Sequence, residues 1–375
     1  MALIGGVLGG GGGLLVAALA LWRVRKLRRK QALHVSLLKE HGLVGADGIS
    51  LMSTRHRTLV DAEQVRSIYA DVVASSSAVG GAPSPHGSHR ASVTSSCSGA
   101  DMRYMVEANW LITGRPQDAA RGINFYLKAS DADLHEKMIH GVASIRREFA
   151  DHGTEEDKEC LHYILNERAG SSAKEFSNGL RDEGRNGETL ADFVSHPSSQ
   201  NSGLTEAHVL ALRLYTSAAY NSINQPLRDL ERKKPHPFPV TVHLIAEGLK
   251  RLRTVAADHE NAHKAEDLWR GMRNLRVTDT FSTDGGTELA PLSTTTDMVV
   301  ALRYAISPES LLFKVVTSSF MERGVNLEYL SCFPGEAEHL FPPLTYLRPT
   351  GNTQVIECGT ECSVTVVEVT PIFGT

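Results

Sequence analysis

The stretch that decides the fold of this chain lies near its C-terminus and reads SCFPGEAEHLFPP (Ser331–Pro343). An apolar start, a Pro–Gly turn and a second bulky apolar run predict two strands joined by a tight turn. Two carboxylates, Glu336 and Glu338, stand two positions apart at that turn. On an extended strand they share one face, whereas on an irregular turn they diverge. The sequence leaves both arrangements open.

Two shorter strings upstream also concentrate polar groups. LWRGM (Leu268–Met272) places Arg270 at a glycine turn, at the expected end of a helix. PLSTTTD (Pro291–Asp297) predicts a strand that runs into hydroxyl groups able to cap a following helix. In chain order, the candidate polar residues are therefore Arg270, Ser293 and Glu338.

The chain around these strings divides into a helical half and a strand half. Residues 101–260 carry apolar side chains at helical spacing, as in Leu134–Phe149, Glu155–Ala169 and Glu206–Ile223. Thr205 is the expected cap of the last of these helices.

Short β-rich runs separated by Gly and Pro follow Trp269, with one helix expected at Thr296–Ala305. The predicted strands are Leu311–Thr317, Leu327–Cys332, Leu344–Arg348, Thr353–Glu357 and Cys362–Val369. Helices first and strands later predict an α+β fold, in which a helical part packs on a mixed or antiparallel, sandwich-like β core. A Rossmann or P-loop nucleotide site is not expected, because neither glycine motif is present.

Composition narrows the function classes further. The 375 residues are 41% hydrophobic and 22% charged, with a net charge of −4, which is typical of a globular protein of two or three domains. Without a basic field, nucleic acid is not an expected partner. Five scattered cysteines form no disulfide scaffold, and their odd number suits a reducing compartment.

The N-terminus predicts a membrane anchor. Ala2–Trp22 carries no charge and is long enough to cross a hydrocarbon core of about 30 Å as a helix. Six basic residues follow directly: Arg23, Arg25, Lys26, Arg28, Arg29 and Lys30. By the positive-inside rule we expect a single-pass protein whose main part is cytoplasmic. A mitochondrial address is the main alternative.

The expected domain organisation follows from these compositions. Residues 1–30 form the anchor and its basic flank, and residues 31–73 form a partly helical juxtamembrane segment. Residues 74–100, rich in Ser, Gly and Pro, form a flexible linker. Residues 101–375 form the main domain, helical over 101–260 and β-rich over 261–375.

Taken in order, the three polar strings resemble the motifs of the arginine-specific mono-ADP-ribosyltransferases: aromatic-Arg-Gly, a Ser-Thr-Ser-like string, and Glu-x-Glu before an apolar strand. ALRLYTSAAYNSINQPLR (Ala211–Arg228) is similar to the helix that precedes the catalytic core in that family. The similarity spans roughly Leu204–Gly351. The chain departs from the family pattern at Thr295, where serine is usual, and at Trp269, where tyrosine is commoner. Neither change removes a functional group.

The resemblance implies transfer of ADP-ribose from NAD⁺ to an arginine side chain of an acceptor protein, with release of nicotinamide. Glu338 would bind a ribose hydroxyl and stabilise positive charge on the ribose. Glu336 would orient the acceptor guanidinium and take its proton. Arg270 would bind phosphate or ribose oxygens, Ser293 would hold Glu338, and Gly271 would let the backbone approach the nicotinamide amide.

The implied NAD⁺-binding set contains two further residues, and aromatic packing near the site is expected from Tyr304 or Phe333. The full set is Arg270, Gly271, Ser293, Thr294, Thr295 and Glu338. Two alternatives remain within the same fold: an NAD⁺ glycohydrolase that uses water as acceptor, and a catalytically inactive binding module.

A zinc site is the rival interpretation of a different string. HENAH (His259–His263) matches H-E-x-x-H, the zinc motif of metalloproteases. Its flanks are polar, and the metzincin spacing needs a third histidine where the chain has Trp269. We interpret the string as a solvated helix face and expect no metal. Cys358 and Cys362 lack a partner pair at ligand spacing and are expected to be structural.

Overall fold

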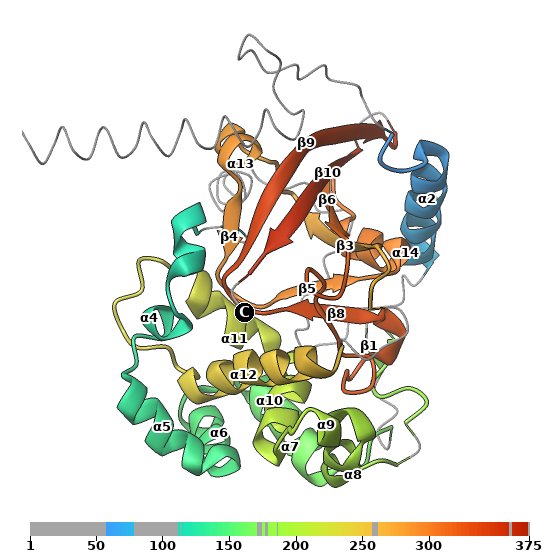
Figure 1. Ribbon diagram of the computed structural model, residues 1–375. Helices are drawn as coiled ribbons and strands as arrows, with labels where there is room; N and C mark the ends of the chain where they lie inside the picture. Colours follow the sequence, from blue (N-terminus) through green and yellow to red (C-terminus); the bar gives the residue numbers. More distant parts are fainter. Residues whose placement is uncertain are drawn as a thin grey trace, which may run out of the picture. The chain divides into compact units, whose positions relative to one another are not determined.

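The computed structural model describes residues 58–78, 112, 114–170, 175–176, 179–185, 187–256, 262–359 and 362–373. Within this part of the chain a set of helices lies below a large sheet in the view of Figure 1. The α+β fold expected from the order of helices and strands is confirmed.

Helices fill the first half of the described chain, as the spacing of apolar residues predicted. They are η1 (Pro116–Ala120), α4 (Ile123–Leu127), α5 (Asp131–Ile139), α6 (Gly141–His152), α7 (Glu155–Asn166), α8 (Leu190–Ser195), α9 (Pro197–Asn201), α10 (Glu206–Tyr215), α11 (Tyr220–Arg228) and α12 (Pro239–Ala256). A small hairpin, β1 (Glu175–Phe176) and β2 (Gly179–Leu180), lies between α7 and α8.

The helix predicted over Glu206–Ile223 is two helices. Thr205 stands at the N-cap position of α10, as expected, and its hydroxyl contacts His208. The helix stops at Tyr215 because the hydroxyls of Thr216 and Ser217 bond back to carbonyls of its last turn. Helix α11 then begins at Tyr220 in a new direction.

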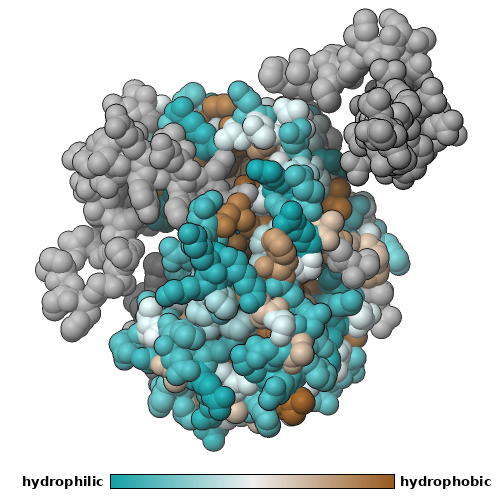
Figure 2. Space-filling view, turned by 90° about the vertical axis from the view of Figure 1, so that its left-hand side faces the viewer, coloured by the Kyte–Doolittle hydropathy of each residue, from teal (hydrophilic) through white to brown (hydrophobic). Residues whose placement is uncertain are grey.

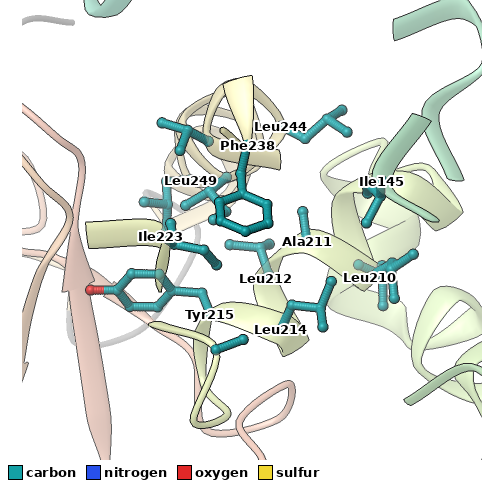
Figure 3. Packing of buried hydrophobic residues seen from close by; sticks show 14 of the residues in the cluster. Ile145, Leu210, Ala211, Leu212, Leu214, Tyr215, Ile223, Phe238, Leu244 and Leu249 are labelled. Carbon is teal, nitrogen blue, oxygen red and sulfur yellow. The ribbon is translucent and has the colours of Figure 1, made fainter. Parts of the chain in front are cut away.

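Helix α10 is the centre of the helical half. Every residue after Glu206 is buried, so the helix is covered on all sides. Figure 3 shows Leu212, Ile223 and Phe238 packed together, with Tyr215 at the edge of the cluster and its hydroxyl pointing away from the apolar side chains. This cluster holds in place the helices whose polar residues reach the sheet.

Eight strands form one mixed sheet in the order β4-β9-β10-β6-β3-β5-β8-β7. The strands are β3 (Glu266–Arg273), β4 (Gly286–Glu288), β5 (Leu292–Thr295), β6 (Glu309–Thr317), β7 (Val325–Asn326), β8 (Glu338–Phe341), β9 (Thr345–Glu357) and β10 (Ser363–Ile372). Only the pair β6–β10 is parallel among these described strands. Two helices, α13 (Asp279–Asp284) and α14 (Met298–Ala305), and the short η2 (Pro334–Glu336) connect strands.

Three local predictions need correction. LWRGM does not end a helix: it lies inside β3, which pairs with β6 along its whole length. Leu327–Cys332 is a turn rather than a strand, closed by hydrogen bonds from Leu330 and Ser331 to the carbonyl of Leu327. The two strands predicted at Leu344–Arg348 and Thr353–Glu357 are one continuous strand, β9.

Residues 58–73, assigned from the sequence to a juxtamembrane segment, pack on the sheet. Helix α2 (Ala62–Ala78) lies beside α14 at the right of Figure 1. Val65 and Tyr69 are buried against a cluster that includes Ile356 and Val364. The carboxamide of Gln354 accepts from the backbone N–H of Leu59 and Val60. This segment therefore belongs to the same compact unit as the sheet, Arg57–Thr375.

The prediction of a single-pass membrane protein is wrong: in the part of the chain that the structure describes, no helix is long and apolar enough to cross a membrane. The segment Ala2–Trp22, on which the prediction depended, lies outside the described residues, as does most of the predicted linker. On the face in Figure 2, hydrophilic residues predominate and hydrophobic ones are scattered, as is usual for a protein surface.

Candidate active site

Three adjacent strands bring the three polar strings together. β3, β5 and β8 are neighbours in the sheet, and Thr295 stands opposite both Trp269 of β3 and Glu338 of β8. Arg270 donates from Nη1 to the carbonyl oxygen of Ser293 at 2.7 Å. The Ser293 side chain in turn hydrogen-bonds to the Glu338 carboxylate. Arg270, Ser293 and Glu338 thus form one connected group, although they are far apart in the sequence.

The Glu338 carboxyl is buried at the start of β8, with 6% of the residue exposed. Its pKa is raised from 4.5 to about 7, mainly by burial and in smaller part by the nearby charge of Glu336. The hydrogen bond from Ser293 and the charge of Arg270 lower the pKa and partly offset that rise. The group is therefore close to its point of half-ionisation at neutral pH.

The second carboxylate takes a different direction. Glu336 is the last residue of η2, and Ala337 has a left-handed backbone with φ of 46°. The chain therefore turns between the two glutamates, and the irregular arrangement is the one observed. The Tyr304 hydroxyl donates to the Glu336 carboxylate, while Thr295 Oγ1 donates to the Glu336 carbonyl at 2.7 Å.

The two threonines of the central motif bind the main chain of the Glu-x-Glu segment. Thr294 Oγ1 donates to the His339 carbonyl at 2.7 Å, and Thr295 binds Glu336 as described. Both threonines are buried. Their role as NAD⁺-binding residues stays a prediction, whereas their hydroxyls already have partners in the main chain of Glu336 and His339.

Gly271 is required by packing. A Cβ atom at this position would lie 1.7 Å from the carbonyl oxygen of Ala301 in α14. Only glycine allows α14 to approach β3 this closely. The expected approach of the Gly271 backbone to nicotinamide stays a prediction, and the structure supplies an independent reason for glycine.

A buried ion pair beside Arg270 was not singled out from the sequence. Arg228, at the end of α11, donates from Nε and Nη2 to both carboxylate oxygens of Glu288, each at 3.0 Å. Glu288 is fully buried in β4. Arg228 is the last residue of the stretch Ala211–Arg228, whose similarity to the family helix pointed to this region. Nothing in the sequence identified Glu288 as its partner.

Helix α11 also contributes Asn224 and Tyr220 to the surroundings of Arg270. Asn224 donates to the Tyr215 hydroxyl at 3.2 Å, and Tyr215 donates to the Pro291 carbonyl at 2.9 Å. Tyr220 is 42% exposed, and its phenol lies near enough to influence the pKa of Arg270. These residues connect the helical half to the start of β5.

Two buried polar atoms in this region have no hydrogen-bond partner among the described residues: Nε of Arg270 and Oδ1 of Asn224. An unsatisfied buried donor or acceptor is costly unless a ligand or water completes it. A dinucleotide offers phosphate and ribose oxygens as acceptors and hydroxyl and amide groups as donors. The residues present therefore fit a molecule such as NAD⁺.

The two aromatic residues expected near the site lie in different parts of the structure. Tyr304 lies at the site and is 44% exposed, whereas Phe333 is buried in the cluster of the helical half. His259 and Glu260 of the rival zinc string lie outside the described residues, and the His263 ring packs against Phe320. The described ranges contain no group of three side chains able to hold a metal ion.

Comparison with known proteins gives a family match over just over half of the chain. A family model described as NAD:arginine ADP-ribosyltransferase matches residues 164–359. This match confirms the resemblance seen in the polar strings. No curated protein sequence matches the chain.

Several solved structures are similar to this one. A variant of the eukaryotic mono-ADP-ribosyltransferase ART2.2 in complex with NADH gives a TM-score of 0.43 at 12% identity, covering 71% of this chain and 93% of that one. The toxin Plx2a from Paenibacillus larvae gives 0.36 at 18% identity, covering 49% and 94%. HopU1 of Pseudomonas syringae gives 0.36 at 16% identity, covering 58% and 97%.

Proposed function

Because this chain belongs to the NAD:arginine ADP-ribosyltransferase family, we propose that it transfers ADP-ribose from NAD⁺ to an arginine side chain of a protein acceptor. Membership makes it an NAD⁺-dependent transferase, and the choice of arginine as acceptor is the proposal. The observation that carries it is the connected group Arg270, Ser293 and Glu338 on three adjacent strands, with Glu336 one turn away.

Arg270 and Asn224 are the residues that would hold the dinucleotide. Nε of Arg270 is a buried donor beside the Glu338 carboxylate and suits a phosphate or ribose oxygen. Asn224 Oδ1 is a buried acceptor for a hydroxyl or amide. NAD⁺ supplies the glycosidic bond between ribose and a cationic nicotinamide, which is a good leaving group.

Glu338 would stabilise the reacting ribose. As the bond to nicotinamide breaks, its electron pair leaves with nicotinamide and positive charge develops on the ribose ring. A carboxylate fixed in a buried position stabilises that charge more strongly than one in water. Ser293 orients the carboxylate, and its hydrogen bond favours the ionised form that this role needs.

Glu336 would hold the acceptor. A guanidinium is protonated at neutral pH and is a poor nucleophile, so it needs a carboxylate that orients it and takes a proton as the new C–N bond forms. Glu336 is half-buried on η2, and the chain turns at Ala337 between it and the buried Glu338. An acceptor can therefore reach it from solvent. With water in place of the guanidine, the same site would hydrolyse NAD⁺.

A single assay separates transfer, hydrolysis and the absence of catalysis. The purified full chain is incubated with labelled NAD⁺ and agmatine, a small guanidine, and both nicotinamide and ADP-ribosyl-agmatine are measured. Glu338→Gln should lose both products. Glu336→Gln should lose the agmatine product and keep nicotinamide release. Glu309→Gln is a matched control, because Glu309 is paired with Arg276 at the start of β6.

Three outcomes would contradict parts of the proposal. Nicotinamide release with no agmatine product in the wild type would indicate a glycohydrolase. No nicotinamide release at all would indicate an inactive binding module. Loss of activity with a chelator would restore the zinc interpretation, since this mechanism uses no metal.

A further inference from the structure

Two residues, one just before helix α14 and one near its end, hold Glu336 at two separate points, its main chain and its carboxylate. Near its start, Thr295 Oγ1 donates to the Glu336 carbonyl at 2.7 Å and also accepts from the backbone N–H of Asp297 at 2.9 Å. Near its end, the Tyr304 hydroxyl donates to the Glu336 carboxylate. The main chain and the side chain of Glu336 are thus fixed by residues that flank one short helix.

The helix itself is fixed at both ends. Asp297 caps the first turn by accepting from the N–H of Val299 at 2.7 Å. Arg273, from the end of β3, donates to the carbonyls of Arg303 and Tyr304, each at 3.1 Å. Between the ends, α14 packs on Gly271 without room for a side chain. Tyr304 therefore presents its hydroxyl to Glu336 from a rigid support attached to the strand that carries Arg270.

We propose that Tyr304 is a positioning residue for the acceptor: its hydroxyl holds the Glu336 carboxylate in the direction that receives a guanidinium. This inference rests on the proposed function and adds to it a determinant outside the Glu-x-Glu turn. Tyr304 itself need not touch the acceptor. Thr295 acts with it by fixing the Glu336 main chain.

The physical reason lies in the freedom of an exposed glutamate. A glutamate side chain on a surface turn samples several rotamers, and ordering it during acceptor binding costs free energy. A phenol that donates to the carboxylate selects one rotamer beforehand, so less ordering is needed when the guanidinium arrives. Each carboxylate oxygen has two acceptor positions, so the bond from Tyr304 leaves room for the guanidinium.

Tyr304→Phe isolates the hydroxyl because the ring and its packing remain. In the assay with NAD⁺ and agmatine, we expect the KM for agmatine to rise about tenfold, from the loss of a hydrogen bond to a charged group. The KM for NAD⁺ should change far less, so the ratio of transfer to hydrolysis falls at fixed agmatine. Tyr346→Phe removes a phenol that donates to the Asp284 carbonyl and should leave the ratio unchanged.

The Thr295 variants give a second measurement. Thr295→Val should lower the transfer-to-hydrolysis ratio in the same direction, and Thr295→Ser should restore it, because serine keeps the hydroxyl without the methyl group. Melting temperatures of all variants identify any general loss of folding.

Three results distinguish failure of this inference from failure of the proposed function. If the wild type modifies agmatine and Tyr304→Phe keeps its ratio and its KM for agmatine, Tyr304 does not position Glu336 and only this inference is overturned. Equal losses of transfer and hydrolysis in Tyr304→Phe overturn it as well. If the wild type makes no agmatine product, the proposed acceptor chemistry and this inference fall together.

Discussion

Glu338 is the residue at which burial and charge act against each other. A buried carboxylate interacts strongly with positive charge on the ribose, because the surroundings screen it little. The same burial raises its pKa to about 7, so part of the population is protonated at neutral pH. Ser293 and Arg270 lower the pKa and limit this loss. Burial therefore strengthens the interaction of ionised Glu338 with the ribose charge, but it lowers the fraction of Glu338 that is ionised.

The raised pKa predicts both a pH profile and a stability difference. If ionised Glu338 is required, kcat/KM for NAD⁺ rises with pH, about tenfold per pH unit below 7, and levels off above it. A carboxyl with a raised pKa favours the folded state below pH 4.5 and loses that contribution as pH rises through about 7. Glu338→Gln should therefore be more stable than the wild type at pH 8, by about 3 kcal/mol, and equally stable at pH 4.

Nicotinamide release and urea unfolding across pH 4–9 test this pair of effects. The Glu309→Gln variant should follow the wild type in both measurements. A stability difference that grows toward low pH would have the wrong sign and would show that burial does not dominate the Glu338 environment.

At the scale of elements, the turn that carries Glu336 is anchored from the helical half. Arg213, fully buried in α10, pairs with Asp182 at 2.8 Å and donates to the Leu330 carbonyl at 2.9 Å. The backbone N–H of Asp182 donates to the Cys332 carbonyl at 2.7 Å. A buried charge without its partner is strongly destabilising, so this pair fixes the path of the chain just before Pro334.

The contact between α14 and β3 gives the prediction at this scale. Gly271→Ala places a methyl group against the Ala301 carbonyl, and the helix must move away from the strand. We expect the free energy of unfolding to fall by about 1–3 kcal/mol, as for other overpacked cores. Because α14 carries Tyr304, transfer to agmatine should decrease as well.

Thermal unfolding and the agmatine assay measure the two effects. Gly359→Ala is the control, since a Cβ atom there meets nothing within 4 Å and the variant should behave as the wild type. Unchanged stability of Gly271→Ala would mean that α14 is not packed directly on β3.

At the scale of the whole molecule, the segment before the helical half is part of the folded unit. Leu59, Val65 and Tyr69 cover the side of the sheet that carries Ile356 and Val364. The Tyr69 hydroxyl donates to the Ser307 carbonyl at 3.1 Å, directly after α14. The compact unit that contains the site therefore spans Arg57–Thr375.

Substitutions on the two faces of α2 test this assignment. Val65→Asp buries an unpaired carboxylate and should lower the free energy of unfolding by about 3 kcal/mol or more. Gln64→Asp places the same side chain one position earlier, on the exposed face of α2, and should change little. Urea unfolding of the full chain measures both, and equal effects at the two positions would show that α2 does not pack on the sheet.

The sequence by itself determined the class of fold and the identity of the polar strings. Helical spacing of apolar residues and short β-rich runs are local patterns, so the division into a helical half and a strand half was readable before any contact was known. The family resemblance followed from the order of the same strings, and the family match confirms it. The N-terminal pattern led to a membrane prediction that the described helices do not support.

Only the tertiary structure decided which groups meet and why. Strand pairing between residues far apart set Glu338 beside Ser293 and Arg270, and no local pattern encodes that register. The tertiary structure also placed LWRGM in a strand. Its glycine leaves room for a helix that packs on the strand and lies thirty residues further along the chain. The Arg228–Glu288 pair, the left-handed Ala337 and the bond from Tyr304 to Glu336 share this origin. Each depends on long-range packing, which fixes distances that the residue order leaves free.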